Sequence, residues 1–190
     1  HKTLDAALDY NATSDAQRNR NVLLWLRELI GASGRRWLAY ADIGCAFQNG
    51  AVNAVLAARI LRPDQFCREI HGTDIVAPPR ELVGRLLDSE RILLYRADPV
   101  RRPLARRYDV IMLANVHRHL DAELQRKLMA NLALSLNENG WLLVNWRFDA
   151  ANSPAVCLQL RGTTLQVAHE INTATFKAAS SRAGIDQKAE

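Results

Sequence analysis

The sequence has few cysteines and no long apolar run, and both absences narrow the class of protein. Three of the 190 residues are cysteines, an odd number without a Cys-x-x-Cys pair, which excludes a disulfide-stapled scaffold. We expect Cys45, Cys67 and Cys157 to be small apolar residues in a reducing compartment. No stretch approaches the ~18 apolar residues of a membrane span. No signal-peptide hydrophobic region follows His1, which favours a cytoplasmic protein without a membrane partner.

The net charge of the sequence is also small. The 25 Lys and Arg residues exceed the 20 Asp and Glu residues by a net charge of only +5. Without a basic face interleaved with aromatic residues, this excess does not indicate a nucleic-acid partner. The densest basic group, Arg101, Arg102, Arg106 and Arg107, is interpreted as a solvated surface loop. The alternative is that these arginines attract an acidic partner.

Short apolar runs alternate with amphipathic stretches along most of the chain. The apolar runs predict buried strands at 37–44, 66–73, 91–97, 108–115 and 140–148. Helical spacing predicts helices at 14–31, 51–61, 79–87 and 122–136, the first of them entered through a capping box at Ser14. Such alternation is typical of an α/β fold with a doubly wound, mostly parallel, Rossmann-like sheet.

The two ends of the chain differ from this alternating part. Residues 155–160 and 165–171 flank a turn and predict a C-terminal antiparallel hairpin, followed by a last helix at 173–182. We expect a loose lead-in at 1–13, one domain at 14–185 and a frayed tail at 186–190. The sequence does not indicate an oligomeric state.

An acid follows each of the first three predicted strands: Asp42, Asp74 and Asp98. In an open α/β sheet, ligands bind outside the carboxyl ends of the strands, and an acid after the second strand accepts hydrogen bonds from ribose hydroxyls. The simpler interpretation of any one of them is that aspartate is common at strand ends and helix N-caps. Three acids at successive strand ends, with a glycine after the first, form a more specific pattern.

Short motifs at these strand ends resemble the class I S-adenosylmethionine-dependent methyltransferases. They lie at 41–45 (Ala-Asp-Ile-Gly-Cys), 71–75 (His-Gly-Thr-Asp-Ile), 96–98 (Arg-Ala-Asp), 108–116 (Tyr-Asp-Val-Ile-Met-Leu-Ala-Asn-Val) and 134–144. The resemblance implies S-adenosylmethionine as the cofactor. It implies a cofactor site made of Asp42, Gly44, Cys45, Ala46, Asp74, Ile75, Asp98 and Asn115. Within that site we expect Asp74 to bind both ribose hydroxyls and Asp98 to lie near the adenine amino group.

A finer resemblance concerns the residues after the fourth strand. Residues 115–120 (Asn-Val-His-Arg-His-Leu), with Gln125 and Arg126, are similar to the glutamate methyltransferases that modify chemotaxis receptors. His117 is the first candidate for a catalytic base, because a neutral imidazole accepts a proton. The alternative is that His117 and His119 form an exposed loop pair without a role. The histidine spacing matches no zinc signature, so we expect no metal.

The methyl acceptor is expected to be an unidentified small molecule or protein with a reactive oxygen or nitrogen. Asn115, His117 and His119 follow the fourth strand, and residues 145–147 end the fifth, so both groups would converge on the edge of the sheet where the cofactor binds. We expect the hairpin at 155–171 to cover this cleft, because irregular additions beyond strand ends usually carry specificity.

The expected cofactor loop departs from the family pattern of an acid followed by three alternating glycines. Only Gly44 fits, since Ala46 and Gln48 occupy the second and third glycine positions and Gly50 comes two residues late. The bulk of residues 47–49 predicts a changed loop path or a partly filled pocket, with Gly50 alone left to adopt a left-handed conformation. No Gly-x-Gly-x-x-Gly follows the first strand, which argues against a dinucleotide.

Two hypotheses follow from this pattern. One is an active S-adenosylmethionine-dependent methyltransferase. The other is a methyltransferase-like binding or regulatory module that has lost turnover, as the altered loop suggests. The three strand-end acids favour the enzyme, because a purely structural descendant has no need of them.

Overall fold

The computed structural model describes residues 16–114, 116, 120–145 and 154–172. Several predictions lie outside these residues, namely the lead-in, the capping box at Ser14, the last helix and the tail. The candidate site residues Asn115, His117 and His119 lie outside them as well. No helix among the described residues is both long enough and apolar enough to cross a membrane.

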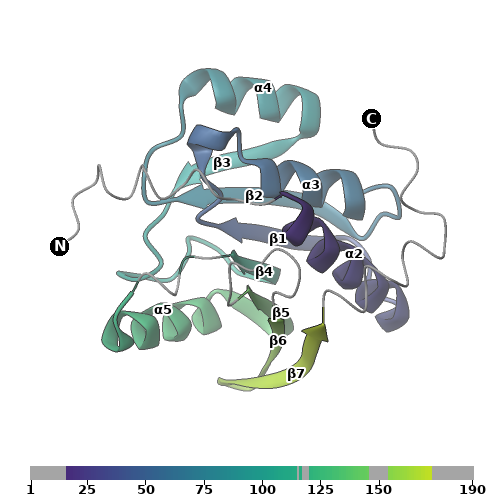
Figure 1. Cartoon of the computed structure of the whole chain (residues 1–190), viewed down its shortest axis with the longest axis vertical. Helices are drawn as coiled ribbons and strands as arrows, with labels where there is room; N and C mark the ends of the chain where they lie inside the picture. Colours follow the sequence, from purple (N-terminus) through teal and green to yellow (C-terminus); the bar gives the residue numbers. More distant parts are fainter. Residues whose placement is uncertain (1–15, 115, 117–119, 146–153, 173–190) are drawn as a thin grey trace.

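A seven-stranded sheet forms the centre of the molecule, in the order β3-β2-β1-β4-β5-β6-β7 (Figure 1). Its strands are β1 (Leu38–Ile43), β2 (Cys67–Asp74), β3 (Ile92–Arg96), β4 (Tyr108–Ala114), β5 (Leu136–Asn145), β6 (Pro154–Arg161) and β7 (Thr164–Asn172). The first five strands run parallel, while β6 pairs antiparallel with β5 and β7 with β6. The predicted fold class is confirmed: an α/β, Rossmann-like, mostly parallel sheet with a C-terminal antiparallel hairpin.

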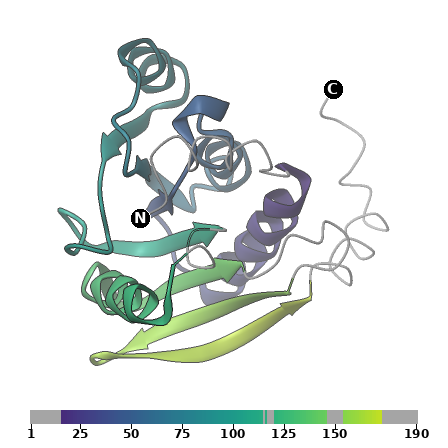
Figure 2. The same cartoon turned by 60° about the vertical axis from the view of Figure 1, so that its left-hand side comes forward.

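Helices cover both faces of the sheet, as a doubly wound sheet requires. The helices are α2 (Ala16–Ser33), α3 (Val52–Leu61), α4 (Arg80–Glu90) and α5 (Ala122–Leu134). Apolar residues of α2, α3 and α4 belong to one core cluster, and those of α5 belong to the other. Figure 2 shows α2 and α5 on opposite sides of β4 and β5. We call the face under α2, α3 and α4 the first face, and the face under α5 the second.

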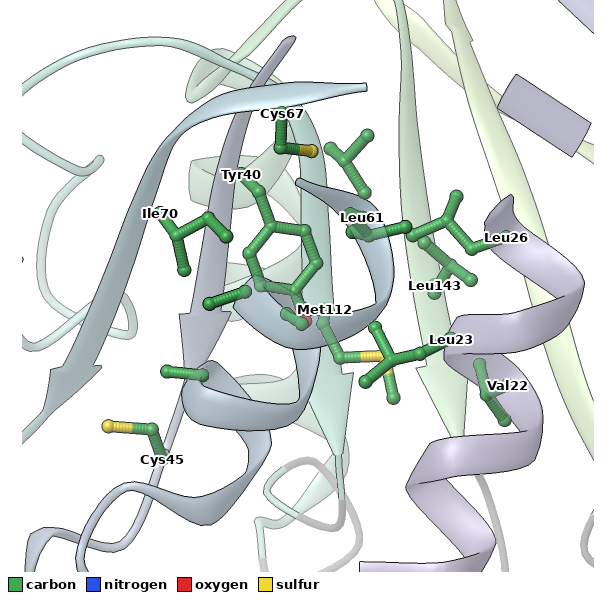
Figure 3. Packing of buried hydrophobic residues seen from close by; sticks show 14 of the residues in the cluster. Val22, Leu23, Leu26, Tyr40, Cys45, Leu61, Cys67, Ile70, Met112 and Leu143 are labelled. Atoms are coloured by element: carbon green, nitrogen blue, oxygen red, sulfur yellow. The ribbon is translucent and has the colours of Figure 1, made fainter. Parts of the chain in front are cut away.

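The two cores follow from the alternation of side chains along each strand. On the first face, Tyr40 of β1 is fully buried among Leu61, Ile70 and Met112 (Figure 3). On the second face, the next residues along the strands pack against Leu128 and other residues of α5. Burying one such leucine or isoleucine side chain contributes roughly 1.5–3 kcal/mol. Strands buried on both sides therefore fix the register and bring their carboxyl ends to one edge.

Two predicted helix ends are wrong, since α4 runs to Glu90 instead of 87 and α5 ends at Leu134 instead of 136. Two further boundaries move for identifiable reasons. Helix α2 runs past Gly31 to Ser33 and ends before Gly34, whose left-handed φ of 70° is typical of a helix C-terminus. Strand β5 begins at Leu136, four residues earlier than predicted. There Leu136 pairs with Tyr108, and the register then shifts so that Trp141 pairs with Val110. The polar residues between them form a bulge in the sheet rather than a free turn.

The hairpin forms as predicted, but its expected position was wrong. Strands β6 and β7 meet at a turn containing Gly162, and Ala155 pairs with Asn145 at the open end of the hairpin. The amide of Gly162 donates to Glu138 Oε1 (3.0 Å), near the start of β5. The turn therefore lies at the amino end of β5, and the hairpin widens the sheet instead of covering its carboxyl edge.

Candidate functional site

The loop after β1 is fixed to the end of β2 by backbone hydrogen bonds. The amides of Gly44 and Cys45 both donate to the carbonyl oxygen of Thr73, at 2.8 and 3.0 Å. The next amide, that of Ala46, donates to Oδ2 of Asp74 (3.1 Å). The predicted cofactor loop and the second strand-end acid are thus parts of one structure at the carboxyl edge of the sheet.

Asp74 is the last residue of β2, whereas the sequence predicted it directly after the strand, and each of its carboxylate oxygens accepts a backbone amide. Oδ2 accepts from Ala46, and Oδ1 accepts from Val76 (3.3 Å). Partial burial raises the pKa of Asp74, and the hydrogen bonds from Val76, Ala46 and Ile75 oppose that rise. A carboxylate has about four lone-pair sites, so both oxygens keep acceptor capacity for a ligand.

Asp42 lies within β1 rather than just after it, which corrects the sequence prediction. Its side chain is 0% exposed, and neither carboxylate oxygen has a hydrogen-bond partner among the described residues. Asp42 pairs with Gly72, so its side chain is on the same face as that of Asp74 two residues further along. Burial first, and the charge of Asp74 second, raise the pKa of Asp42 well above its usual range.

The backbone of the loop adopts left-handed conformations at four residues. From the sequence, only Gly50 was expected to do so after Gly44. Gly44, Ala46, Gly50 and Ala51 have φ of 69°, 54°, 72° and 55°. Alanine tolerates this region at a cost of roughly 1–2 kcal/mol, which the hydrogen bonds to Thr73 and Asp74 help to offset. At Gly44, an added Cβ would lie 2.3 Å from Cγ2 of Val116. Gly44 is thus required by its φ and by this contact.

The bulky residues of the loop separate into buried and exposed side chains. Phe47, Gln48 and Asn49 form one turn of 3-10 helix, η2 (Phe47–Asn49). Phe47 packs into the first-face core, while the side chains of Gln48 and Asn49 are exposed. The turn therefore directs Phe47 into the core and leaves the two polar side chains at the surface.

The other predicted cofactor residues lie around this loop. Cys45 is buried, and burial raises the pKa of its thiol. Ile75 is 48% exposed, and its carbonyl accepts from Nε of Arg96 (2.9 Å). Asp98 follows β3; its Oδ1 accepts from the amide of Val100 (3.2 Å), and its Oδ2 pairs with Arg101 (3.2 Å). These contacts of Asp98 are those of a turn residue, the simpler interpretation given above.

Sequence reasoning missed a chain of buried asparagines on the first face. Asn145, the last residue of β5, donates through Nδ2 to Oδ1 of Asn19 in α2 (3.4 Å). Asn19 donates through Nδ2 to Oδ1 of Asn53 in α3 (2.7 Å). The three side chains are 0–5% exposed, and Oδ1 of Asn145 has no partner among the described residues. The sequence carried one signal for this chain of asparagines: Asn19 precedes Val22 and Leu23 by three and four residues, so its amide lies on the apolar face of the helix.

The described edge of the sheet offers hydrogen-bond acceptors. Asp42, Asp74 and Asn145 provide carboxylate and amide oxygens on one face, beside a loop whose first residue has no side chain. Such a set suits a ligand that carries hydroxyl or ammonium donors. S-adenosylmethionine carries both, on its ribose and on its amino-acid part, so these residues fit the cofactor that the resemblance implies.

Known proteins give a likeness of fold alone. No family model matches the sequence, and no curated protein matches it. Among solved structures, it is similar to the N-methyltransferase NodS from Bradyrhizobium japonicum WM9 in complex with S-adenosyl-L-homocysteine (22% identity, 74% of this chain, 71% of that chain, TM-score 0.49). It is also similar to a TehB-like SAM-dependent methyltransferase from Corynebacterium glutamicum ATCC 13032 Kitasato (17% identity, 65% of this chain, 62% of that chain, TM-score 0.47). A third similar structure is magnesium protoporphyrin IX methyltransferase from Synechocystis PCC 6803 with bound SAH (16% identity, 68% of this chain, 56% of that chain, TM-score 0.49). The chain spans less than two thirds of the last two.

Proposed function

We propose that this chain is a class I S-adenosylmethionine-dependent methyltransferase. The observation that carries the proposal is the position of Asp74, whose carboxylate ends β2 and accepts the amide of Ala46 in the loop after β1. This arrangement sets an acid with remaining acceptor sites beside a loop that begins with Gly44. It is the place where a doubly wound sheet binds the ribose of a nucleoside-containing ligand.

Each residue of the site then has a task in holding the cofactor. Asp74 would accept hydrogen bonds from the ribose hydroxyls, and Gly44 would let the backbone approach the ligand. Cys45, Ala46 and Ile75 would line the same region, and Asp98 would lie toward the adenine. The bound cofactor supplies a methyl group already activated on a sulfonium. The chain therefore needs to orient two reactants and, where the acceptor carries a proton, to remove it.

For the acceptor, we propose an oxygen or nitrogen nucleophile. The similarity of residues 115–120 to the glutamate methyltransferases of chemotaxis receptors favours a protein carboxylate as the first acceptor to test. Asn115 and His117 are proposed to face the acceptor; a carboxylate needs no base, so His117 would accept a proton only where the nucleophile is a hydroxyl or an amine. Activity toward a hydroxyl or an amine would fall at acid pH, where a histidine is protonated and no longer accepts a proton. The change His117→Ala should then remove that pH dependence, and His119→Ala should leave it.

The three cysteines support a proposal for where the protein works. Cys45, Cys67 and Cys157 are all free thiols buried in the protein. Buried free thiols suit a reducing compartment, so we propose that the protein works in the cytoplasm. Cell fractionation with an antibody to the chain checks this directly, and recovery from an oxidising compartment would contradict it.

A binding or regulatory module without turnover is the second candidate. The replacement of two family glycines by Ala46 and Gln48 favours it. Calorimetry with S-adenosylmethionine and with S-adenosylhomocysteine separates the proposals from other functions. The enzyme should bind both and transfer a radiolabelled methyl group to a glutamate-bearing peptide or another acceptor. Saturable binding without transfer to any acceptor favours the module, and binding of neither ligand contradicts both.

A further inference from the structure

One crossover of the parallel sheet has no helix. The connections from β1 to β2, from β2 to β3 and from β4 to β5 each carry one, namely α3, α4 and α5. The connection from β3 to β4, residues 97–107, contains only turns and bends. Its Val100 and Leu104 pack into the second-face core with residues of β1 and β4. This connection therefore covers the middle of the second face and, among the described residues, leaves the outer strand β3 without a covering helix.

The second face of β3 is accordingly open to solvent. Leu93 pairs with His71 and is 46% exposed, although it lies in the centre of a strand. Tyr95, two residues further on, is half-buried. Its hydroxyl hydrogen-bonds to that of Tyr108 (2.7 Å), which in turn hydrogen-bonds to Nδ1 of His71 (2.7 Å). These bonds fix the side chains of His71 and Tyr95 on the same face as Leu93.

Arginines outnumber acids in the connection that runs over this face, since residues 97–107 hold four arginines and one acid, Asp98. Glu69 of β2 pairs with both Arg106 (2.6 Å) and Arg68 (3.3 Å), so one carboxylate faces two guanidinium groups. Within the described part of the chain, the exposed Arg102 and Arg107 have no acidic partner. Like charges brought together by two copies of this surface would repel, which disfavours self-association here. Carboxylates would be attracted.

We propose that the open second face of β3 is a docking surface for an acidic amphipathic helix of a partner protein. The helix would occupy the layer that the missing crossover helix leaves free. Its apolar side would contact Leu93 and Tyr95, and its acidic side would face Arg102, Arg106 and Arg107. Apolar contact at the centre and complementary charge at the rim is the usual anatomy of such an interface. The surface is independent of the proposed methyltransferase site, because it lies on the opposite face from Asp42 and Asp74.

The test uses the full chain and a fluorescein-labelled amphipathic peptide of about four helical turns, built from Leu and Glu. We expect fluorescence anisotropy to show binding that weakens with salt. The double change Arg102→Glu/Arg107→Glu should weaken it about tenfold or more, and Leu93→Ser should weaken it comparably. The matched control is Arg126→Glu, which reverses an exposed charge on α5 and should leave the affinity unchanged. Circular dichroism melts confirm that each variant folds.

Four outcomes overturn the proposal. One is no binding of the Leu-Glu peptide, and another is equal binding by the Arg102→Glu/Arg107→Glu and wild-type chains. A third is equal or tighter binding of the same peptide with Lys in place of Glu. The fourth is tighter binding of oligo-dT through Arg102 and Arg107, which would assign the surface to nucleic acid. Because none of these measurements uses S-adenosylmethionine, failure here is distinguishable from failure of the proposed methyltransferase function.

Discussion

The carboxylate of Asp74 accepts the backbone amide of Ala46 at 3.1 Å. This bond joins the end of β2 to the loop after β1, which are the two segments that the proposed cofactor site needs to hold together. It also opposes the strain at Ala46, whose φ is left-handed. A change in this loop is therefore expected to alter both stability and ligand binding.

Gly44→Ala should destabilise the protein by more than the backbone conformation alone would cause. A left-handed φ costs an alanine roughly 1–2 kcal/mol, and contact with Val116 should add about 1–3 kcal/mol as overpacking. Gly34→Ala is the matched control, because Gly34 has φ 70° and an added Cβ would meet nothing within 4 Å. Urea unfolding of both variants measures the difference. Equal losses would show that the Val116 contact is unimportant.

Asn19→Leu should lower the free energy of unfolding by about 2 kcal/mol or more, because it leaves buried polar atoms of Asn53 and Asn145 without a partner. Adding Asn53→Leu removes one of those orphaned groups, so the double variant should lose less than the sum of the single changes. A double-mutant cycle by denaturant unfolding checks this coupling. Strict additivity would mean that the two amides do not interact.

Tyr108→Phe should cost about 1–3 kcal/mol, since it leaves Nδ1 of the buried His71 without its partner. Tyr95→Phe should cost less, because Tyr108 still bonds to His71 and Tyr95 is only half-buried. Thermal melts of the two variants give the order. A larger loss for Tyr95→Phe would contradict the role assigned to the inner hydroxyl.

The pH dependence of stability should reveal the buried acid Asp42. Its folded-state pKa is raised, so the folded state binds more protons than the unfolded state, and stability falls as the pH rises above the unfolded value of about 4. The slope from one group is at most about 1.4 kcal/mol per pH unit. Asp42→Asn should flatten the wild-type curve, measured by urea unfolding at a series of pH values. The matched control is Asp88→Asn at an exposed position, which should leave the curve unaltered. If Asp42→Asn also left the curve unaltered, the raised pKa assigned to Asp42 would be wrong.

Local pattern was enough for those features that depend on neighbours in the sequence. Apolar runs gave the five parallel strands, and the turn near Gly162 gave the hairpin. Asp74 was predicted within one residue of the end of β2, because strand length and turn chemistry are local. Where pairing between distant segments decided the structure, the predictions failed. Leu136 begins β5 only because it pairs with Tyr108, and the hairpin joins the sheet edge only because β6 pairs with β5.

The cofactor loop shows the same limit at the scale of single residues. Ala46 and Ala51 adopt left-handed conformations that their residue type disfavours. The hydrogen bonds from Gly44, Cys45 and Ala46 to β2 help to fix this backbone, and no local pattern reports them. Likewise, the contact between Asn19 and Asn53 depends on how α2 packs against α3. Sequence periodicity places each asparagine on an inward face without pairing them.

The affinity of S-adenosylhomocysteine for the wild-type chain and for Asp74→Ala, measured by calorimetry, tests the central claim most directly. Hydrogen bonds to a charged group are worth roughly 1.5–3 kcal/mol. We therefore expect saturable binding by the wild type and a loss of about tenfold or more in Asp74→Ala, while Asp88→Ala on the exposed side of α4 binds as the wild type does. No binding by the wild type, or an unchanged dissociation constant in Asp74→Ala, would contradict the account.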